Sequence, residues 1–453
     1  MSAIASKRAR VENRVVGSRE VALQVVRDVF GDHPRGAREA LDYRTRAANT
    51  SPRDRAFATE LAYGSIKLRR WLDYQLAPYL GERQATLPKA IAEVLRLGVY
   101  QLRVMNGVEP YAAVSESVGL ARRYGHKGTA GLVNAVLRKV SVEPVREVTG
   151  DDDDAVALRA SLPTWLVTQW RSRFSAEALP LILAGVNAPA AIGLCIDLRR
   201  GGRDEALAIL RGANIPAEAS VFARDAIVLD GTSPSTGVDA LADGRWDMHA
   251  EAACFPVDIL DPQPNDVIFE ACSGRGNKTL QIASRTGDTG RLEAIDIEPR
   301  RVATAQERMD AAHVTSAMLK VGDASTVSPD ADYDRVLVDA PCSGLGIVGR
   351  QPESRWRKDP TDGARLAPLQ STILAAAAGR LKAGGTLVYS VCSTDARESE
   401  DVVNALLAGH PSFARAPMPE RYAPFITGAG DVLVPPGIGG RDGFYIARLT
   451  RSA

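Results

Sequence analysis

Two cysteines in this sequence each end a short apolar run and precede polar residues, a setting that could serve chemistry. Cys342 lies in VLVDAPCSG (336–344), where the acid Asp339 precedes it. Cys392 lies in LVYSVCST (387–394). Proline, serine and glycine around Cys342 favour a turn. Because free cysteine is among the most buried residue types, a pair of structural thiols remains an alternative.

Two thiols and a carboxyl group suit methylation of a pyrimidine ring at carbon 5. That carbon is a weak nucleophile, but a thiolate that adds to carbon 6 makes it enamine-like. A second group can assist loss of the carbon-5 proton, and a carboxyl group near N3 can stabilise charge there. From the residues alone, catalysis and burial stay equally open for Cys342 and Cys392, whereas Cys195 and Cys254 are interpreted as structural.

The stretch VIFEACSGRGNKT (267–279) predicts a strand, a glycine-rich turn and the start of a helix. Gly274 and Gly276 would let the backbone approach a ligand closely, and the helix start would offer free N–H groups. Asp296 follows Gly274 by 22 residues, the usual distance for a carboxylate that binds a ribose diol. The pattern therefore predicts a nucleotide site.

The cofactor expected at this site is S-adenosylmethionine. Thr279 occupies the position of the third glycine that a dinucleotide motif requires. S-adenosylmethionine carries no phosphates and needs a ribose acid and an adenine-side acid, for which Asp323 in KVGDAS is the candidate. A helix N-cap is the alternative role of Asp323. A nicotinamide-dependent oxidoreductase is the alternative enzyme, disfavoured by Thr279 and the strand-end cysteines.

Elements that would position these residues begin near residue 249. Short apolar runs alternate there with helical stretches, which predicts a doubly wound parallel sheet. The runs are DVIFEA, RLEAIDIE, AMLKVGDAS, DRVLVDAP and GTLVYSVCS. In such sheets ligands bind beyond the carboxyl ends of the strands, near the point where strand order reverses. Both cysteines fall at such ends.

Two further regions are predicted before this sheet. Residues 16–145 form amphipathic helices, as in AIAEVLRLGVYQLRVM, where Ile91, Val94 and Leu95 share one stripe. The run Asp151–Asp154 is expected not to pack and to mark a linker or domain boundary, because like charges beside Pro and Gly do not pack. Residues 155–248 form a small α+β module, and residues 249–453 form the catalytic domain.

Composition is typical of a soluble globular protein, with 45% hydrophobic and 25% charged residues. We expect a cytoplasmic protein, because the N-terminus lacks the apolar core of a signal peptide and no run of about 18 apolar residues occurs. Five cysteines without C-x-x-C and five histidines without H-E-x-x-H predict neither a disulfide framework nor a metal site.

Charge is unevenly distributed along the chain. Residues 1–145 hold 24 Lys and Arg against 14 Asp and Glu, a net charge of +10, so the remainder carries −9. A basic region joined to an acidic one is typical of a nucleic-acid-binding module attached to an enzyme. A solvated, arginine-rich helical face is the alternative, and charge alone does not separate the two.

The motifs EACSGRGNKT, AIDIEPRR, GDAS, VLVDAPCSGLG and LVYSVCS resemble, in order, those of the RsmB/NOP/Sun family of RNA 5-methylcytosine methyltransferases. The resemblance extends to the closing GRDGFYIARL. RDRAFATELAYGSI, LRLGVYQL and GLVNAVLRK resemble the NusB-like RNA-binding domain of the ribosomal-RNA members. It implies a Rossmann-like class I methyltransferase domain with an antiparallel closing strand, after an all-α NusB-like domain and a small α+β module.

The resemblance also implies residue roles. Cys392 would be the attacking thiolate, Cys342 the thiol that aids product release, and Asp339 the acid near N3. RNA, most readily 16S rRNA, would be the partner of a monomer without metal. Transfer RNA is the alternative substrate, and a non-catalytic RNA-binding or antitermination factor is the alternative of another class. The cofactor pocket would comprise Cys272, Ser273, Gly274, Arg275, Gly276, Asn277, Lys278, Asp296, Asp323 and Asp339.

Three motifs depart from the family pattern. The usual C-A-A-P-G-G-K is CSGRGNK here, with Arg275 for proline and Asn277 for a glycine; asparagine tolerates positive φ better than most residues. The family's L-R-x-N appears as LCID (194–197), and Q-D-x-A-S as HAEAA (249–253). We expect the pocket to survive with altered affinity, and the RNA contacts to differ more than the chemistry.

Overall fold

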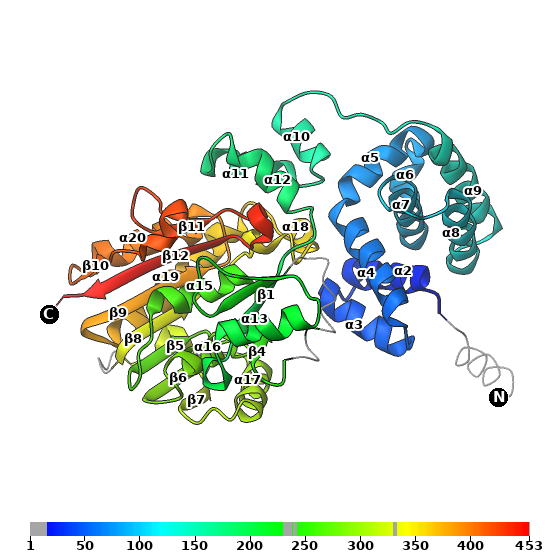
Figure 1. Ribbon diagram of the computed structural model, residues 1–453. Coiled ribbons are helices and arrows are strands. Elements are labelled where there is room, and N and C mark those ends of the chain that lie inside the picture. Colours follow the sequence, from blue (N-terminus) through cyan, green and yellow to red (C-terminus); the bar gives the residue numbers. More distant parts are fainter. Residues whose placement is uncertain (1–15, 230–237, 239–241, 329–332, 453) are drawn as a thin grey trace, which may run out of the picture. The chain divides into compact units, whose positions relative to one another are not determined.

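The computed structural model describes residues 16–229, 238, 242–328 and 333–452 (Figure 1). The chain divides into two compact units. Unit 1 comprises residues 1–168 and 351–357, and unit 2 comprises residues 169–350 and 358–453. Among the described residues, no helix is both long and apolar enough to span a membrane.

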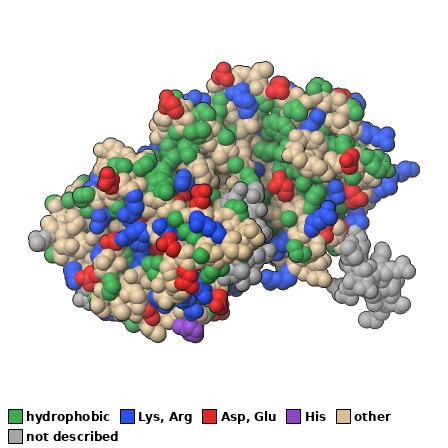
Figure 2. Space-filling view, in the orientation of Figure 1, with side chains coloured by type: hydrophobic (Ala, Val, Ile, Leu, Met, Phe, Trp, Pro, Cys, Tyr) green, Lys and Arg blue, Asp and Glu red, His purple; other side chains and the backbone are tan. Residues whose placement is uncertain are grey.

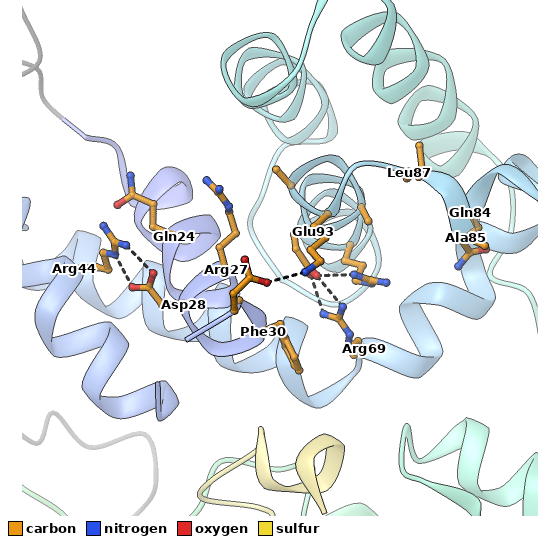
Figure 3. Close-up of a pocket in the computed structure, with 16 residues that line it drawn as sticks. Gln24, Arg27, Asp28, Phe30, Arg44, Arg69, Gln84, Ala85, Leu87 and Glu93 are labelled. Carbon is orange, nitrogen blue, oxygen red and sulfur yellow. Dashed lines mark hydrogen bonds and ion pairs between the residues drawn. The ribbon is translucent and has the colours of Figure 1, made fainter. Parts of the chain in front are cut away.

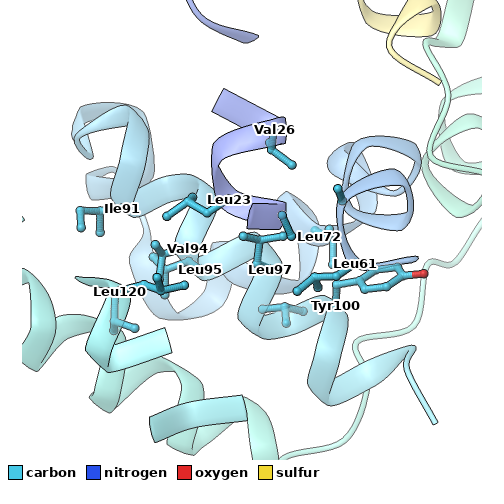
Figure 4. Close-up of a cluster of buried hydrophobic side chains, with 14 of the residues drawn as sticks. Leu23, Val26, Leu61, Leu72, Ile91, Val94, Leu95, Leu97, Tyr100 and Leu120 are labelled. Atoms are coloured by element: carbon cyan, nitrogen blue, oxygen red, sulfur yellow. The ribbon is translucent and has the colours of Figure 1, made fainter. Parts of the chain in front are cut away.

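Unit 1 is built from amphipathic helices that bury one shared core. Apolar side chains of α2, α4, α5 and α8 gather around α7, where Ile91, Val94 and Leu95 are fully buried, as the stripe predicted (Figure 4). Burial of such stripes is the main source of stability of short helices. The helices are α2 (Ser18–Phe30), α3 (Ala37–Ala47), α4 (Pro52–Lys67), α5 (Arg69–Leu80), α6 (Arg83–Thr86), α7 (Lys89–Arg103), α8 (Pro110–Tyr124), α9 (Lys127–Val142), α10 (Asp153–Arg159) and α18 (Ser354–Arg357).

The aspartate run is not left unpacked, contrary to the expectation from its like charges. Asp152 caps α10, its side chain accepting a hydrogen bond from Ala155 N at 2.8 Å. Asp154, in the first turn of that helix, accepts one from Arg70 at 2.7 Å. Acidic residues are stabilised at a helix N-terminus by the free N–H groups and the helix dipole, so the like charges start a helix instead.

Unit 2 begins with a small antiparallel sheet in the order β2-β3-β1-β4. Its core contains Leu194, Ile196, Ile227 and Trp246. The helix α11 (Thr164–Arg173) spans the boundary between the units. The other elements are α12 (Ala178–Gly185), β1 (Ile192–Ile196), η1 (Leu198–Arg200), α13 (Arg203–Gly212), β2 (Ala217–Ala219), β3 (Ala226–Leu229) and β4 (Trp246–Met248).

Over the residues that the structure describes, the main sheet of unit 2 has eight strands, in the order β10-β12-β9-β8-β5-β6-β7, with β11 paired to β12. Strands β5 to β9 run parallel, and β12 is antiparallel to β9, which confirms the predicted doubly wound sheet with its antiparallel closing strand. Strand order reverses between β5 and β8. The strands are β5 (Val267–Ala271), β6 (Arg291–Asp296), β7 (Ala317–Val321), β8 (Tyr333–Asp339), β9 (Leu381–Val391), β10 (Phe413–Arg415), β11 (Val432–Val434) and β12 (Phe444–Arg451).

Helices cover both faces of this sheet, so its central strands are apolar on both sides. On one face Ile268, Leu337 and Val388 pack with α15 and α16. On the other, Phe269 and Val336 pack with α19 and α20. These helices are α15 (Glu251–Leu260), α16 (Asn277–Arg285), α17 (Pro299–Ala311), α19 (Asp362–Gly379) and α20 (Glu400–Gly409); short 3₁₀ turns are η2 (Ala324–Thr326), η3 (Leu345–Ile347), η4 (Ala396–Glu398), η5 (Glu420–Phe425) and η6 (Ile438–Gly440).

Basic side chains of unit 2 lie beside acidic ones on the face shown in Figure 2. Ion pairs elsewhere in unit 2 include Arg308 with Asp247, and Arg245 with Glu205 at 2.6 Å. On this face the surface of unit 2 therefore has mixed charge rather than a patch of one sign.

Candidate active site

The two candidate thiols meet because their strands are neighbours. Strands β8 and β9 are parallel, with Asp339 opposite Ser390. Cys342 lies three residues beyond the end of β8, and Cys392 follows the last residue of β9. Their sulfurs are 3.3 Å apart, and both side chains are partly exposed. The structure thus places both thiols at one point of the sheet edge.

The environment of Cys342 favours its protonated form. A hydrogen bond with the Cys392 sulfur, together with burial, raises the pKa of the Cys342 thiol well above its ordinary value. Thiolate is the nucleophilic form of cysteine, so Cys342 is a poor nucleophile in this arrangement. It is suited instead to exchange a proton with a neighbouring group.

Asp339 is held by two groups at the end of β8. Lys278 Nζ lies 2.7 Å from Asp339 Oδ2, and Ser390 Oγ donates to Oδ1 at 2.8 Å. Burial acts to lower the pKa of Lys278, but the neighbouring Asp339 carboxylate outweighs it and the pKa is raised. Lys278 therefore stays charged and fixes the orientation of the carboxyl group beside the thiols.

The glycine turn between β5 and α16 requires left-handed backbone at alternate positions. Cys272, Gly274 and Gly276 have φ of 60°, 59° and 78°. At Gly276 an added Cβ would lie 3.0 Å from Ala305 Cβ, so both space and φ demand glycine there. Burial, with the charge of Asp339, raises the pKa of Cys272 to about 12, so this third thiol is not a nucleophile.

Asn277 does not take the positive φ expected from its place in a glycine motif. It is the first residue of α16, and the left-handed residue is Gly276 before it. Asn277 Oδ1 accepts a hydrogen bond from Arg308 at 2.8 Å, and its Nδ2 donates to Asp247 at 3.2 Å. Arg308 also binds the carbonyl of the exposed Arg275 at 2.8 Å. Arg308 of α17 therefore holds the altered glycine loop in place through these hydrogen bonds.

The two expected cofactor acids lie at the carboxyl ends of β6 and β7. Asp296 is buried, and its Oδ2 accepts a hydrogen bond from Gly274 N at 2.9 Å, which joins it to the glycine turn. Asp323 is exposed and caps η2 by accepting from Ser325 N at 2.9 Å. Asp323 thus has the N-cap role that was its alternative in the sequence analysis. Its exposed side chain also lies at the sheet edge formed by the carboxyl ends of the strands.

Comparison with known proteins decides the family. The chain is 32% identical over 412 residues to the probable ribosomal RNA small subunit methyltransferase B of Bacillus subtilis, covering 88% of this chain and 91% of that protein. It is 33% identical over 443 residues to ribosomal RNA small subunit methyltransferase B of Thermus thermophilus, covering 96% and 97%. The chain belongs to the RsmB/F methyltransferase family.

Family models extend this assignment along the chain. The model described as 16S rRNA methyltransferase RsmB/F matches residues 257–450, that of the NusB family residues 17–142, and an RsmF/B-like ferredoxin-like domain residues 162–236. The crystal structure of PH0851 shares the fold, with a TM-score of 0.81 over 96% of this chain and 98% of that one at 19% identity. The resemblance seen in the motifs is confirmed, and the chain is a methyltransferase.

Glu398 belongs to this site, but it was not predicted from the sequence. Glu398 is fully buried, and its carboxylate accepts hydrogen bonds from residues directly after both thiols. Ser343 N donates at 2.8 Å and Ser393 Oγ at 2.6 Å, while Ser343 Oγ and Gln370 add further bonds. Glu398 therefore ties together the two loops that carry Cys342 and Cys392. Nothing in the local sequence distinguishes it from a surface glutamate.

Glu270, on β5 beneath the glycine turn, was also missed. It is almost completely buried, and Thr279 Oγ1 donates to its Oε2 at 2.7 Å. Burial raises its pKa to about 8, so it is largely protonated at neutral pH. Its apolar neighbours VIF gave the only indication that this acid would be inside.

A cavity of about 750 Å³ lies in unit 1 between α2, α5 and α7 (Figure 3). Arg44 pairs there with Asp28 at 2.7 Å, and Arg69 pairs with Glu93 at 2.8 Å. Its lining residues include no cysteine. Lys89 and Arg96 are also paired with acids, and Arg27 lies over the ring of Tyr124, so the cavity offers nothing comparable to the thiol pair.

Proposed function

We propose that this chain is an S-adenosylmethionine-dependent methyltransferase that forms 5-methylcytosine in RNA, most readily in 16S rRNA. The observation that carries the proposal is the pair of sulfurs 3.3 Å apart beside Asp339. The names of the relatives, ribosomal RNA small subunit methyltransferase B, support the choice of RNA. The basic helical unit 1 would contribute affinity for the phosphate backbone.

The residues around the glycine turn suit the proposed cofactor. Ser273 Oγ is buried and has no hydrogen-bond partner among the described residues, as expected of a group that binds a ligand. When bound, S-adenosylmethionine supplies an electrophilic methyl group. In the proposal Asp296 binds the ribose and Asp323 the adenine side. The rest of the pocket comprises Cys272, Gly274, Arg275, Gly276, Asn277, Lys278 and Asp339.

In the proposed mechanism, the Cys392 thiolate adds to carbon 6 of the cytosine ring. The electron pair of the carbon 5–carbon 6 double bond moves through carbon 4 onto N3, and Asp339, after taking a proton from the Lys278 ammonium beside it, would donate that proton to N3 and so neutralise the charge. Carbon 5 is then nucleophilic enough to accept a methyl group. In the later steps Cys342 would first give up its own proton to solvent; as a thiolate it would then take the carbon-5 proton, while the Cys392–carbon 6 bond breaks and Cys392 leaves as a thiolate.

The target base must leave any helix to reach these thiols. A cytosine within a duplex is stacked, so the enzyme would act on a flipped or single-stranded base. RNA loops and bulges present such bases, which suits a structured rRNA hairpin. The mixed small module and unit 1 would then hold the flanking RNA.

Two assays test the proposal. The purified protein, supplied with methyl-labelled S-adenosylmethionine, should label 16S rRNA, and transfer RNA serves as the alternative substrate. Bisulfite sequencing of rRNA from a strain that lacks the gene should show the loss of one protected cytosine. An unchanged pattern of protected cytosines, together with no labelling of either RNA, would refute the proposal. Binding of RNA without transfer would favour a non-catalytic factor.

A further inference from the structure

Three buried side chains with metal-binding atoms meet where the small sheet packs against α15. Cys195 lies on β1, His249 directly follows β4, and Cys254 lies on α15. Their ligand atoms all lie within 4.8 Å of one another, and Cys254 Sγ is 3.6 Å from His249 Nδ1. All three residues are buried. The proposed methyl-transfer mechanism uses none of them.

Two of the three residues occupy positions where this chain departs from the family pattern. Cys195 stands at the arginine of L-R-x-N, and His249 at the glutamine of Q-D-x-A-S. The two motifs are more than 50 residues apart in the sequence, and the sheet brings them together: β1 pairs with β4, and His249 N donates to Gly193 O at 2.9 Å. The sheet thus brings Cys195 and His249, from the two altered motifs, into one cluster with Cys254.

We propose that Cys195, His249 and Cys254 bind one zinc ion. Zinc prefers thiolate and imidazole ligands in tetrahedral geometry, with Zn–S near 2.3 Å and Zn–N near 2.0–2.1 Å. Those lengths place a sulfur and a nitrogen ligand about 3.6 Å apart. The distance between Cys254 Sγ and His249 Nδ1 has this value before any rearrangement.

A water molecule would complete the tetrahedron. Cys195 lines a cavity of about 200 Å³, together with Trp246 and Gln281. Gln281 is almost fully buried, and its Oε1 has no hydrogen-bond partner among the described residues. That oxygen is a ready acceptor for a zinc-bound water, the kind of outer contact that orients metal ligands. Of the three ligands, Cys195 alone lines this cavity.

Charge balances at the site. On binding, Cys195 and Cys254 each release one proton, both thiolates donate electron pairs to the metal, and neutral His249 donates the lone pair of Nδ1. A doubly charged cation replaces two protons, so the net charge of the buried cluster does not change. The charged groups that act on Cys195, Asp225 and Arg285, are paired with each other at 2.6 Å. Three cations act on His249, and each is paired with an acid: Lys278 with Asp339, Arg308 with Asp247 and Arg350 with Asp442.

The bound ion would have a structural effect. It would join β1 and the end of β4 to α15, the first helix of the methyltransferase region. Gln281 Nε2 on α16 donates to the Cys254 carbonyl at 3.1 Å, so the helix that begins at the glycine turn is attached to the same point. Because the three donors lie far apart in sequence, the absence of C-x-x-C gave no sign of this site.

The experiment uses the full chain and needs no activity. The purified, chelator-treated protein is titrated with Zn²⁺ while the thermal midpoint is followed, and with Co²⁺ while sulfur-to-cobalt charge transfer is read in the near-ultraviolet. We expect one equivalent of each metal to bind, with a rise in the midpoint. Cys195→Ser and Cys254→Ser should abolish the band, and His249→Gln, which restores the family residue, should weaken binding roughly tenfold or more.

The control is the double variant Cys342→Ser/Cys392→Ser, because the active-site sulfurs are a second thiol pair that could bind the same metals. The proposal predicts an unchanged band and stoichiometry in this control. If wild type shows no band and no thermal shift, the proposal is wrong even should a site variant fail to fold. If the band disappears in the double variant but survives in Cys254→Ser, the metal belongs to the catalytic pair and the proposal is equally wrong.

Discussion

Glu398 shows how one buried carboxylate can set the geometry of a pair of reacting groups. The sulfurs of Cys342 and Cys392 do not touch it, yet the residues that follow each of them, Ser343 and Ser393, both hydrogen-bond to it. Hydrogen bonds to a charged acceptor are stronger than neutral ones, and each holds its loop at a fixed distance. The separation of the two thiols therefore depends on a residue outside the reaction.

Glu398→Gln should lower kcat roughly tenfold or more and leave KM for RNA within about twofold, because only the placement of the reacting groups changes. The amide nitrogen must donate where one carboxylate oxygen accepted, so the serine hydroxyls that donated to that oxygen have to turn and accept, which moves the loops that carry the thiols. Steady-state kinetics with circular dichroism checks this. Asp401→Asn, an exposed acid nearby, is the matched control. Equal kcat in the Glu398 variant would contradict the positioning role.

At the scale of elements, the alternation of apolar runs and helices was enough to predict the parallel sheet and the edge where the acids and thiols meet. Local interactions that depend on distant partners could not be predicted. Asn277 appeared to need positive φ, but contacts with Arg308 and Asp247 hold it in a helix instead. The like charges of Asp151–Asp154 predicted repulsion, but the N-terminus of α10 supplies a hydrogen-bond donor to the run. Glu398 and the Cys195 cluster have partners that only the fold supplies.

Strand β5 carries a prediction about pH. Burial raises the pKa of Glu270 to about 8, above its ordinary value of 4.5. The folded state therefore holds this proton more tightly than the unfolded one, so the stabilising contribution is complete below about pH 4.5 and is lost as pH rises toward 8. Glu270→Gln cannot ionise and should lack this decline.

Urea midpoints of the wild type and Glu270→Gln, measured between pH 5 and 8.5, check this. As pH increases, the urea midpoint of the variant should rise relative to that of the wild type. The control, Glu307→Gln, alters an exposed glutamate of α17 in the same unit and should follow the wild-type profile. Parallel profiles for Glu270→Gln and the wild type would show that Glu270 ionises normally.

At the scale of the whole molecule, the boundary between the units is not a single cut in the chain. Residues 351–357 belong to unit 1, although they follow the Cys342 turn by only a few residues. Trp356 packs against the helical core, and its Nε1 donates to Ile66 O at 2.7 Å. Glu353 accepts from Ala37 N at 2.9 Å. Unit 1 is therefore completed by a segment of the sequence that carries the catalytic motifs.

Trp356→Ala should destabilise unit 1 by about 3 kcal/mol, since a large side chain and a hydrogen bond are lost together. Trp356→Phe, which keeps most of the packing, should cost only about 1 kcal/mol. Differential scanning calorimetry that resolves the transition of unit 1 would measure both. Lys358→Ala, just outside the segment, is the control. A Trp356→Ala transition identical to wild type would mean that the segment adds nothing to unit 1.

The most direct test of the central claim is covalent trapping of RNA by two variants, each of which lacks one of the two thiols. Each variant is incubated with substrate RNA and S-adenosylmethionine and run on a denaturing gel. We predict that Cys342→Ala accumulates a protein–RNA adduct, because the bond to carbon 6 forms but is not released. Cys392→Ala should form no adduct and transfer no methyl group. Methylation by Cys392→Ala at the wild-type rate would contradict the account.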